Sequence, residues 1–105
     1  MFGRKKKLPT ITTSPGGFCV DDRSVGWSLI SSIKAFKLDL ITYDQICLAV
    51  AVDGDDCYVQ LSEEWPGFQE LAEELESRFA FPEGWWDSVA KPAFKTNETI
   101  LYQRT

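Results

Sequence analysis

The clearest hydrophobic pattern in the chain is that of a β-hairpin at its centre. Residues 45–52 form an apolar, β-rich run, residues 53–56 (Asp-Gly-Asp-Asp) are typical of a turn, and residues 57–61 alternate between apolar and polar. With a four-residue loop, Val50 faces Val59 and one side of the hairpin is wholly apolar. That side holds Ile46, Leu48, Val50, Val52, Cys57, Val59 and Leu61. Because a slip of one residue would mix the two sides, the pattern predicts the register as well as the strands.

The next segment, residues 66–79, has the spacing of an amphipathic helix. Its apolar stripe consists of Phe68, Leu71, Leu75 and Phe79. These residues recur every three or four positions, and glutamates occupy the outer side. Pro66 suits a first helical turn, and Pro82 prevents the helix from continuing. We predict that this stripe covers the apolar side of the hairpin.

Three further strands and one short helix complete the predicted elements. The strands are expected at residues 18–20, 32–38 and 99–104, the last of them at an edge of the sheet, and the short helix at residues 83–90. The predicted fold class is therefore α+β. It consists of an antiparallel sheet of about five strands packed on one main helix, plus a short C-terminal helix.

The first residues differ in composition from the rest. Arg4-Lys5-Lys6-Lys7 is a run of like charges, and prolines and glycines follow it up to Gly17. We therefore expect residues 1–16 to be a flexible basic tail and residues 17–105 to be a single α+β domain.

Charge is distributed unevenly between these two parts. The chain carries a formal net charge of −5. Without the four basic residues of the tail, seven basic residues face 16 acidic ones, a balance of −9. An acidic body would repel phosphates, so we expect no nucleic-acid partner, and it would attract a basic protein by long-range electrostatics.

Candidate catalytic chemistry is sparse in this sequence. The chain has no histidine, and Cys47, the one thiol placed away from the apolar side of the hairpin, has no base to activate it. Carboxylates remain as candidates, alone or with a metal, namely Asp39, Asp44 and Glu63. The turn at residues 53–56 lacks the length and the final glutamate of a calcium-binding loop. We expect no catalytic residue, cofactor or metal site.

Tryptophan is the residue type that points to a binding surface. Adjacent helical residues are about 100° apart, so Trp85 and Trp86 cannot both enter the core in the same direction. Core packing of both against different elements is the favoured arrangement, and a tryptophan that faces a partner is the alternative. Since tryptophan is enriched at binding hot spots, Trp85, Trp86 and Trp65 are the partner-binding candidates.

Several residues carry a resemblance to known proteins. Trp27, Ile30 and Ile33 precede Asp39, the hairpin follows, and then come Gly67-Phe68, Trp86 and the final Leu-Tyr-x-Arg. This outline resembles small bacterial single-domain proteins, and the front half is similar to bacterial pleckstrin-homology-like domains. The final strand after the helix departs from the pleckstrin-like pattern. Neither resemblance implies an activity.

Together these observations predict a non-catalytic protein-binding or adaptor domain, an immunity-like protein being one form of it. Two alternatives stay open: a small carboxylate- or metal-dependent enzyme, and a weak peripheral membrane binder that uses Arg4–Lys7. An odd number of cysteines and the lack of an apolar stretch after the basic start indicate a cytoplasmic location.

Overall fold

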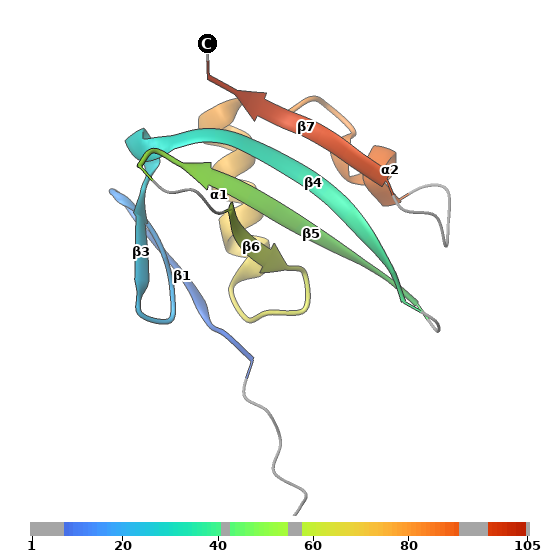
Figure 1. Cartoon of the computed structure of the whole chain (residues 1–105), viewed down its shortest axis with the longest axis horizontal. Helices are drawn as coiled ribbons and strands as arrows, with labels where there is room; N and C mark the ends of the chain where they lie inside the picture. The colour runs from blue at the N-terminus through green and yellow to red at the C-terminus, as the bar shows by residue number, and fades with distance from the viewer. Residues whose placement is uncertain (1–7, 41–42, 55–57, 91–96, 105) are drawn as a thin grey trace, which may run out of the picture.

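The described part of the chain forms two antiparallel sheets and two helices (Figure 1). The computed structural model describes residues 8–40, 43–54, 58–90 and 97–104. The small sheet has the order β1 (Ile11–Ser14), β2 (Gly17–Val20), β3 (Arg23–Gly26). A 3-10 turn, η1 (Trp27–Leu29), leads from it into the large sheet. The large sheet consists of β4 (Ile30–Leu40), β5 (Tyr43–Val52), β6 (Tyr58–Ser62) and β7 (Asn97–Gln103), in the order β6-β5-β4-β7.

The central hairpin has the predicted register. Val50 lies opposite Val59 on β5 and β6, and the neighbouring pairs follow the same frame. The predicted inward position of Cys57 falls outside the described residues. The last strand, β7, pairs antiparallel with β4 and forms an edge of the large sheet, as the sequence predicted.

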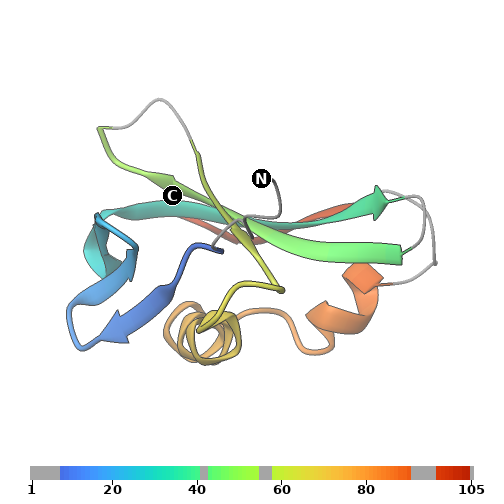
Figure 2. The same ribbon diagram turned by 90° about the horizontal axis from the view of Figure 1, so that it is seen from below.

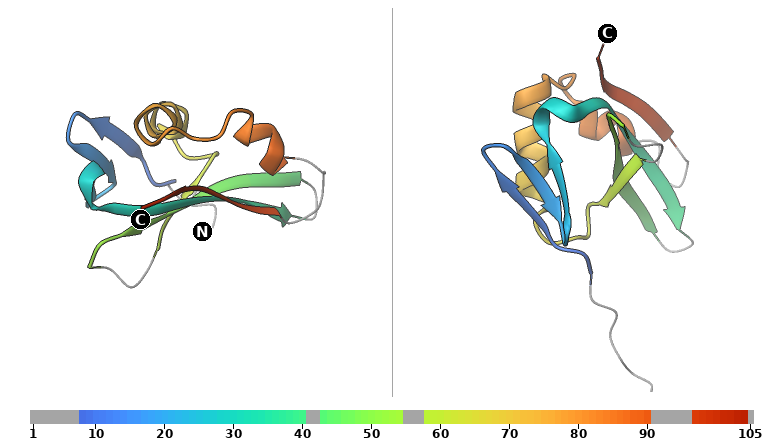
Figure 3. Two further views of the ribbon diagram at one scale, coloured as in Figure 1. Left: turned by 90° about the horizontal axis from the view of Figure 1, so that it is seen from above. Right: turned by 60° about the vertical axis from the view of Figure 1, so that its left-hand side comes forward.

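The small sheet and the two helices cover one face of the large sheet. The helices are α1 (Phe68–Phe79) and α2 (Trp85–Ala90). Figures 2 and 3 show the small sheet at one end of this face, α1 in the middle and α2 at the other end. The core between the layers includes Phe18, Ile33, Leu48, Val50, Leu61, Leu71, Leu75 and Val89. The apolar side of the hairpin and the stripe of α1 therefore belong to one core, as predicted.

The predicted fold class is wrong in its strand count and its balance of elements. Among the described residues, seven strands in two antiparallel sheets, of three and four strands, replace the expected single sheet of about five strands on one main helix. The protein is mostly β. The two strands that the sequence did not predict, β1 and β3, both belong to the small sheet.

The composition of β1 and its turn explains the error. Only Ile11 of β1 is buried, and the three residues after it are exposed. Pro15-Gly16, which suggested an irregular tail, connects β1 to β2. Residues 11–14 are therefore a strand of the domain, although the sequence placed them within the tail at residues 1–16. Residues 1–7 lie outside the described part of the chain.

Gly67 joins the small sheet to the start of α1. The backbone N–H of Ile11 donates to the carbonyl oxygen of Pro66 at 2.9 Å. Gly67 has a φ of 89°, and a Cβ at this position would lie 1.9 Å from the carbonyl oxygen of Ile11. A residue with a side chain does not fit there, because both the backbone conformation and the close approach exclude it.

The opposite face of the large sheet carries a mixture of apolar and charged side chains. Leu38, Tyr58 and Ile100 are among the exposed large apolar residues, and Ile100 exposes 57% of its surface. The Lys34 ammonium lies 4.9 Å above the Tyr58 ring and 3.8 Å from a carboxylate oxygen of Glu98. In the described strands this face is therefore partly accessible to solvent, with Cys47 and Ala49 buried on it, whereas the first face is filled.

Candidate functional site

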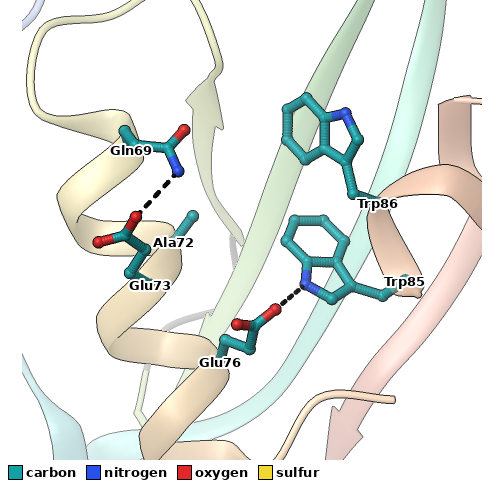
Figure 4. A pocket seen from close by; sticks show the side chains of 6 residues that line it. All are labelled: Gln69, Ala72, Glu73, Glu76, Trp85 and Trp86. Atoms are coloured by element: carbon teal, nitrogen blue, oxygen red, sulfur yellow. Dashed lines mark hydrogen bonds between the residues drawn. The ribbon is translucent and has the colours of Figure 1, made fainter. Parts of the chain in front are cut away.

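A groove between α1 and α2 is the best candidate site on the protein. Its volume is about 470 Å³. The lining residues are Gln69, Ala72, Glu73 and Glu76 from α1 and Trp85 and Trp86 from α2. Figure 4 shows the two indole rings pointing from α2 towards the side of α1 that carries the glutamates. The groove therefore has one aromatic wall and one wall whose charged groups are carboxylates.

The two adjacent tryptophans occupy different environments. Trp85 is 5% exposed and packs its ring against Phe81 at 5.4 Å between centroids. Trp86 is 36% exposed and contacts Trp85 and the buried Phe68 edge-on, at 5.4 and 6.4 Å. The angular separation of neighbouring helical residues explains why only one of the two indoles reaches the core. Trp86 is thus held by two aromatic rings while a part of its surface remains available to a ligand.

Glu76 connects the two walls of the groove. Its Oε2 accepts a hydrogen bond from Nε1 of Trp85 at 2.7 Å (Figure 4). This bond satisfies the polar tip of a buried indole, which otherwise costs free energy, and it fixes the orientation of the carboxylate. Glu76 itself is exposed, so its second oxygen faces a position that a ligand can reach.

Glu73 lies one helical turn before Glu76 and is also exposed. Its Oε2 accepts a hydrogen bond from the side-chain amide of Gln69 at 3.2 Å. Negative charge continues on α2, where Asp87 follows Trp86 and is exposed. Asp87 does not line the groove, so the carboxylates that face the accessible indole come from α1.

A buried lysine holds α2 in place. Lys37 of β4 is 1% exposed, and its Nζ donates to the carbonyl oxygen of Ala90, the last residue of α2, at 2.9 Å. A cation at the C-terminal end of a helix satisfies a carbonyl group that has no partner within the helix. This role of Lys37 was not predicted from the sequence. The sequence pattern that could have indicated the burial of Lys37 is its position on the same side of the strand as Ile33 and Ala35, which are both fully buried.

The structure places two of the three predicted partner-binding residues in the groove. Trp85 and Trp86 line it, and Trp65 does not. Trp65 lies in the connection between β6 and α1, half-buried against the core, and its backbone N–H bonds to the carbonyl oxygen of Ser62. The acidic wall, Glu73 and Glu76, was not among the predicted site residues. The helical pattern had placed these glutamates on an outer side without indicating what lies opposite.

The candidate catalytic carboxylates do not form a described site. Asp39 and Asp44 are paired across β4 and β5, but their side chains are outside the described part of the chain. Glu63 accepts the backbone N–H of Ile46 at 2.5 Å and so extends the hairpin. Among the described residues, no group of three or more cysteines and carboxylates is arranged to hold a metal ion.

Cys47 lies in an environment that suppresses thiolate formation. Its pKa is raised to about 11, mainly by burial and further by the negative charges of Glu63 and Glu64. The thiol is 5% exposed, and its Sγ lies 3.6 Å from the side-chain oxygen of Gln45. Since the thiolate is the reactive form, this cysteine is adapted to packing.

Comparison with known proteins adds no assignment to this geometry. No family model matches the chain, no curated protein matches its sequence, and no solved structure matches its fold. The resemblances drawn from the sequence therefore stay predictions. In the part of the chain that the structure describes, no helix is long and apolar enough to cross a membrane.

Proposed function

We propose that the protein is a non-catalytic binding domain that takes a basic segment of a partner protein into the groove between α1 and α2. The observation that carries this proposal is the pairing of an accessible indole, Trp86, with two carboxylates across the groove, Glu73 and Glu76. An indole face attracts a cation through its π electrons, and a carboxylate attracts it through its charge.

Arginine is the side chain that fits these groups best. Its guanidinium is planar, stacks on aromatic rings and donates several hydrogen bonds in its own plane. Stacked on Trp86, it would direct these donors towards Glu73 or the second oxygen of Glu76. A lysine ammonium would gain the same charge but would neither stack nor bind two oxygens in a fixed geometry.

The strength of the contact sets a requirement on the partner. A cation on an aromatic ring contributes about 0.5–2 kcal/mol, and an exposed ion pair adds about 0–1 kcal/mol. Together these terms fall short of the roughly 4 kcal/mol that a millimolar complex needs. The partner must therefore supply several basic residues, which the acidic charge of the domain would attract before the groove is filled.

Calorimetric titration with an arginine-rich peptide tests the proposal. The probe is an unstructured peptide with four arginines, and its matched forms carry lysine or glutamine at the same positions. We expect binding in the order arginine, lysine, glutamine. Glu73→Gln should weaken the arginine peptide about fivefold or more, since a charged hydrogen bond is lost. Trp86→Ala should reduce the preference for arginine over lysine.

A matched control separates the groove from the net charge. Glu70→Gln removes the same charge from the same helix at an exposed position that does not line the groove. We expect this variant to weaken binding less than about twofold, through the long-range field alone. Equal losses of affinity in Glu70→Gln and Glu73→Gln would show that the groove does not bind the peptide specifically.

A further inference from the structure

The rings of Trp85 and Trp86 meet almost at a right angle, and we infer that the angle between them binds a methylated lysine, so that methylation of the partner strengthens its binding. The inference rests on the proposed function, because it concerns the same groove and the same basic partner. It uses three observations: the angle between the two rings, the contacts that hold each ring, and the space in front of them.

The two indoles form one corner of the groove. Their centroids lie 5.4 Å apart and their planes cross at 77°. Both rings line the groove, and because Trp86 is partly exposed and Trp85 is buried, Trp86 forms a wall and Trp85 a part of the floor. A cation in the angle between two such rings lies within about 6 Å of both centroids, the distance at which an aromatic ring attracts a positive charge. The corner can therefore bind a cation with two rings at once.

Each ring of the corner is held by its own contacts. Trp85 packs against Phe81 with an angle of 85° between the rings, and its Nε1 donates a hydrogen bond to Glu76. Trp86 contacts the buried Phe68 at an angle of 61°. A side chain that is already fixed loses little conformational freedom when a ligand arrives, so the ordering of the site costs little binding free energy. The corner is therefore formed before the partner binds.

A small residue on α1 leaves room in front of the corner. Ala72 lines the groove on the α1 side, and Figure 4 shows its methyl group pointing towards the indoles. A longer side chain at this position would fill the space that the two rings enclose. The groove volume of about 470 Å³ lies within the range of about 300–1,000 Å³ that is typical of ligand sites. The head of a trimethylated lysine and a part of its stem therefore fit.

Methylation changes how a lysine binds to this corner. Trimethylation keeps the positive charge, removes the three N–H donors and adds three methyl groups. An unmodified ammonium is strongly hydrated and has to lose bound water before it reaches an indole face. The methylated head loses less water and places its methyl groups against Trp85 and Trp86, while Glu73 and Glu76 still attract its charge. We therefore expect trimethyllysine to bind about fivefold more tightly than lysine.

Calorimetric titration with modified peptides tests the inference. The probe is an unstructured peptide with four lysines. In its matched forms one lysine is replaced by trimethyllysine, or by a neutral analogue that has a tert-butyl carbon in place of the methylated nitrogen. We expect affinity to fall in the order trimethyllysine, lysine, neutral analogue. A trimethyllysine form that binds no more tightly than the lysine form would overturn the inference. Equal affinities of the trimethyllysine and neutral forms would also overturn it, because the gain would then come from apolar contact alone.

Two variants make the result specific to the corner. Trp86→Leu keeps an apolar side chain but removes the ring, so the trimethyllysine and lysine peptides should bind to it with nearly equal affinity. Glu70→Gln, at an exposed position outside the groove, is the matched control and should leave the ratio of the two affinities unchanged. A ratio that persists in Trp86→Leu would overturn the inference. If Trp86→Leu does not fold, the neutral analogue on the unchanged chain still decides between charge and apolar contact.

Nuclear magnetic resonance with tetramethylammonium chloride separates this inference from the proposed function. Ammonium chloride at the same concentration is the control, and we expect the indole N–H of Trp86 and the methyl group of Ala72 to shift only with tetramethylammonium. Equal shifts with both salts would overturn the inference. If the arginine peptide binds but trimethylation of a lysine changes nothing, the inference fails and the proposed function stands. If no peptide binds, the proposed function fails, while the shifts at Trp86 and Ala72 still report whether the corner binds a quaternary ammonium group.

Discussion

The two sheets of the protein reach their stability in different ways. The large sheet has strands of up to 11 residues, and the alternation along β5 and β6 fills one of its faces with apolar side chains. Each strand of the small sheet has four residues, and the sheet contributes Ile11, Phe18 and Val25 to the main core. A long alternating pattern specifies which strands pair and in which register. A short strand with one buried side chain depends instead on the elements that this side chain packs against.

Contacts outside its own strands hold the small sheet in place. The hydrogen bond from Ile11 to Pro66 ties β1 to the residue before α1. The Arg78 guanidinium of α1 lies 4.7 Å from the centre of the Trp27 ring, and the indole N–H of Trp27 donates to the carbonyl oxygen of Pro15 at 3.0 Å. The small sheet is therefore an extension of the helical layer as much as a sheet of its own.

The largest effect is expected in the core beneath the large sheet. Leu48→Ala and Leu71→Ala remove fully buried side chains, and each should lower the free energy of unfolding by about 2–5 kcal/mol, because the lost burial leaves a cavity. Urea denaturation followed by circular dichroism measures this change. Gln60→Ala, at an exposed position of β6, is the control and should stay within about 0.5 kcal/mol. Losses below about 1 kcal/mol at both leucines would contradict the shared core.

The junction between the small sheet and α1 should give the next largest effect. Gly67→Ala adds a Cβ at 1.9 Å from the Ile11 carbonyl oxygen and forces a left-handed backbone, so we expect a loss of about 3 kcal/mol in unfolding free energy. Gly84→Ala is matched in φ, at 75°, but has no atom within 4 Å, and it should cost only the backbone term of about 1–2 kcal/mol. Equal losses would show that the close approach between Gly67 and Ile11 contributes nothing.

The free energy of local opening should also differ between the two sheets, by less than the effects of the substitutions above. We expect the amides of β2 to exchange with solvent through an opening at least about 1 kcal/mol easier than that of β5, since the small sheet buries fewer apolar side chains. Hydrogen exchange followed by nuclear magnetic resonance measures both strands in one sample. Equal protection of Phe18 and Val50 would mean that the two sheets open as one unit.

The smallest effect is expected at Cys47, which lies in the large sheet. With a pKa of about 11 in place of 9.0, its thiolate fraction at pH 8 is about a hundredfold lower than that of an ordinary thiol. In a Cys19→Ser/Cys57→Ser background, the rate of thiol alkylation against pH should have its midpoint near 11. Because the pKa is raised in the folded state, the thiol stabilises the fold below pH 9, and this contribution is lost as the pH rises towards 11. A midpoint near 9 would place this thiol in water.

One wall of the candidate site is related to a pattern in the sequence, and the other wall depends on tertiary packing. Adjacent tryptophans on a short helix left two arrangements open, burial of both or exposure of one, and in the structure Trp86 is exposed while Trp85 is buried. The acidic wall was not predictable, since it depends on which side of α1 faces α2. That choice follows from the connection between the two helices and from the bond between Lys37 and Ala90, neither of which leaves a periodic signal in the chain.

Local alternation and helical spacing determined the central hairpin, its register and α1, because each of these patterns has one arrangement that buries its apolar side. Only the tertiary structure decided the small sheet, the buried position of Lys37 and the meeting of Glu73 and Glu76 with the tryptophans. These features depend on single residues that gain their partners from distant segments, and the free energy of such contacts exists only after the layers have packed.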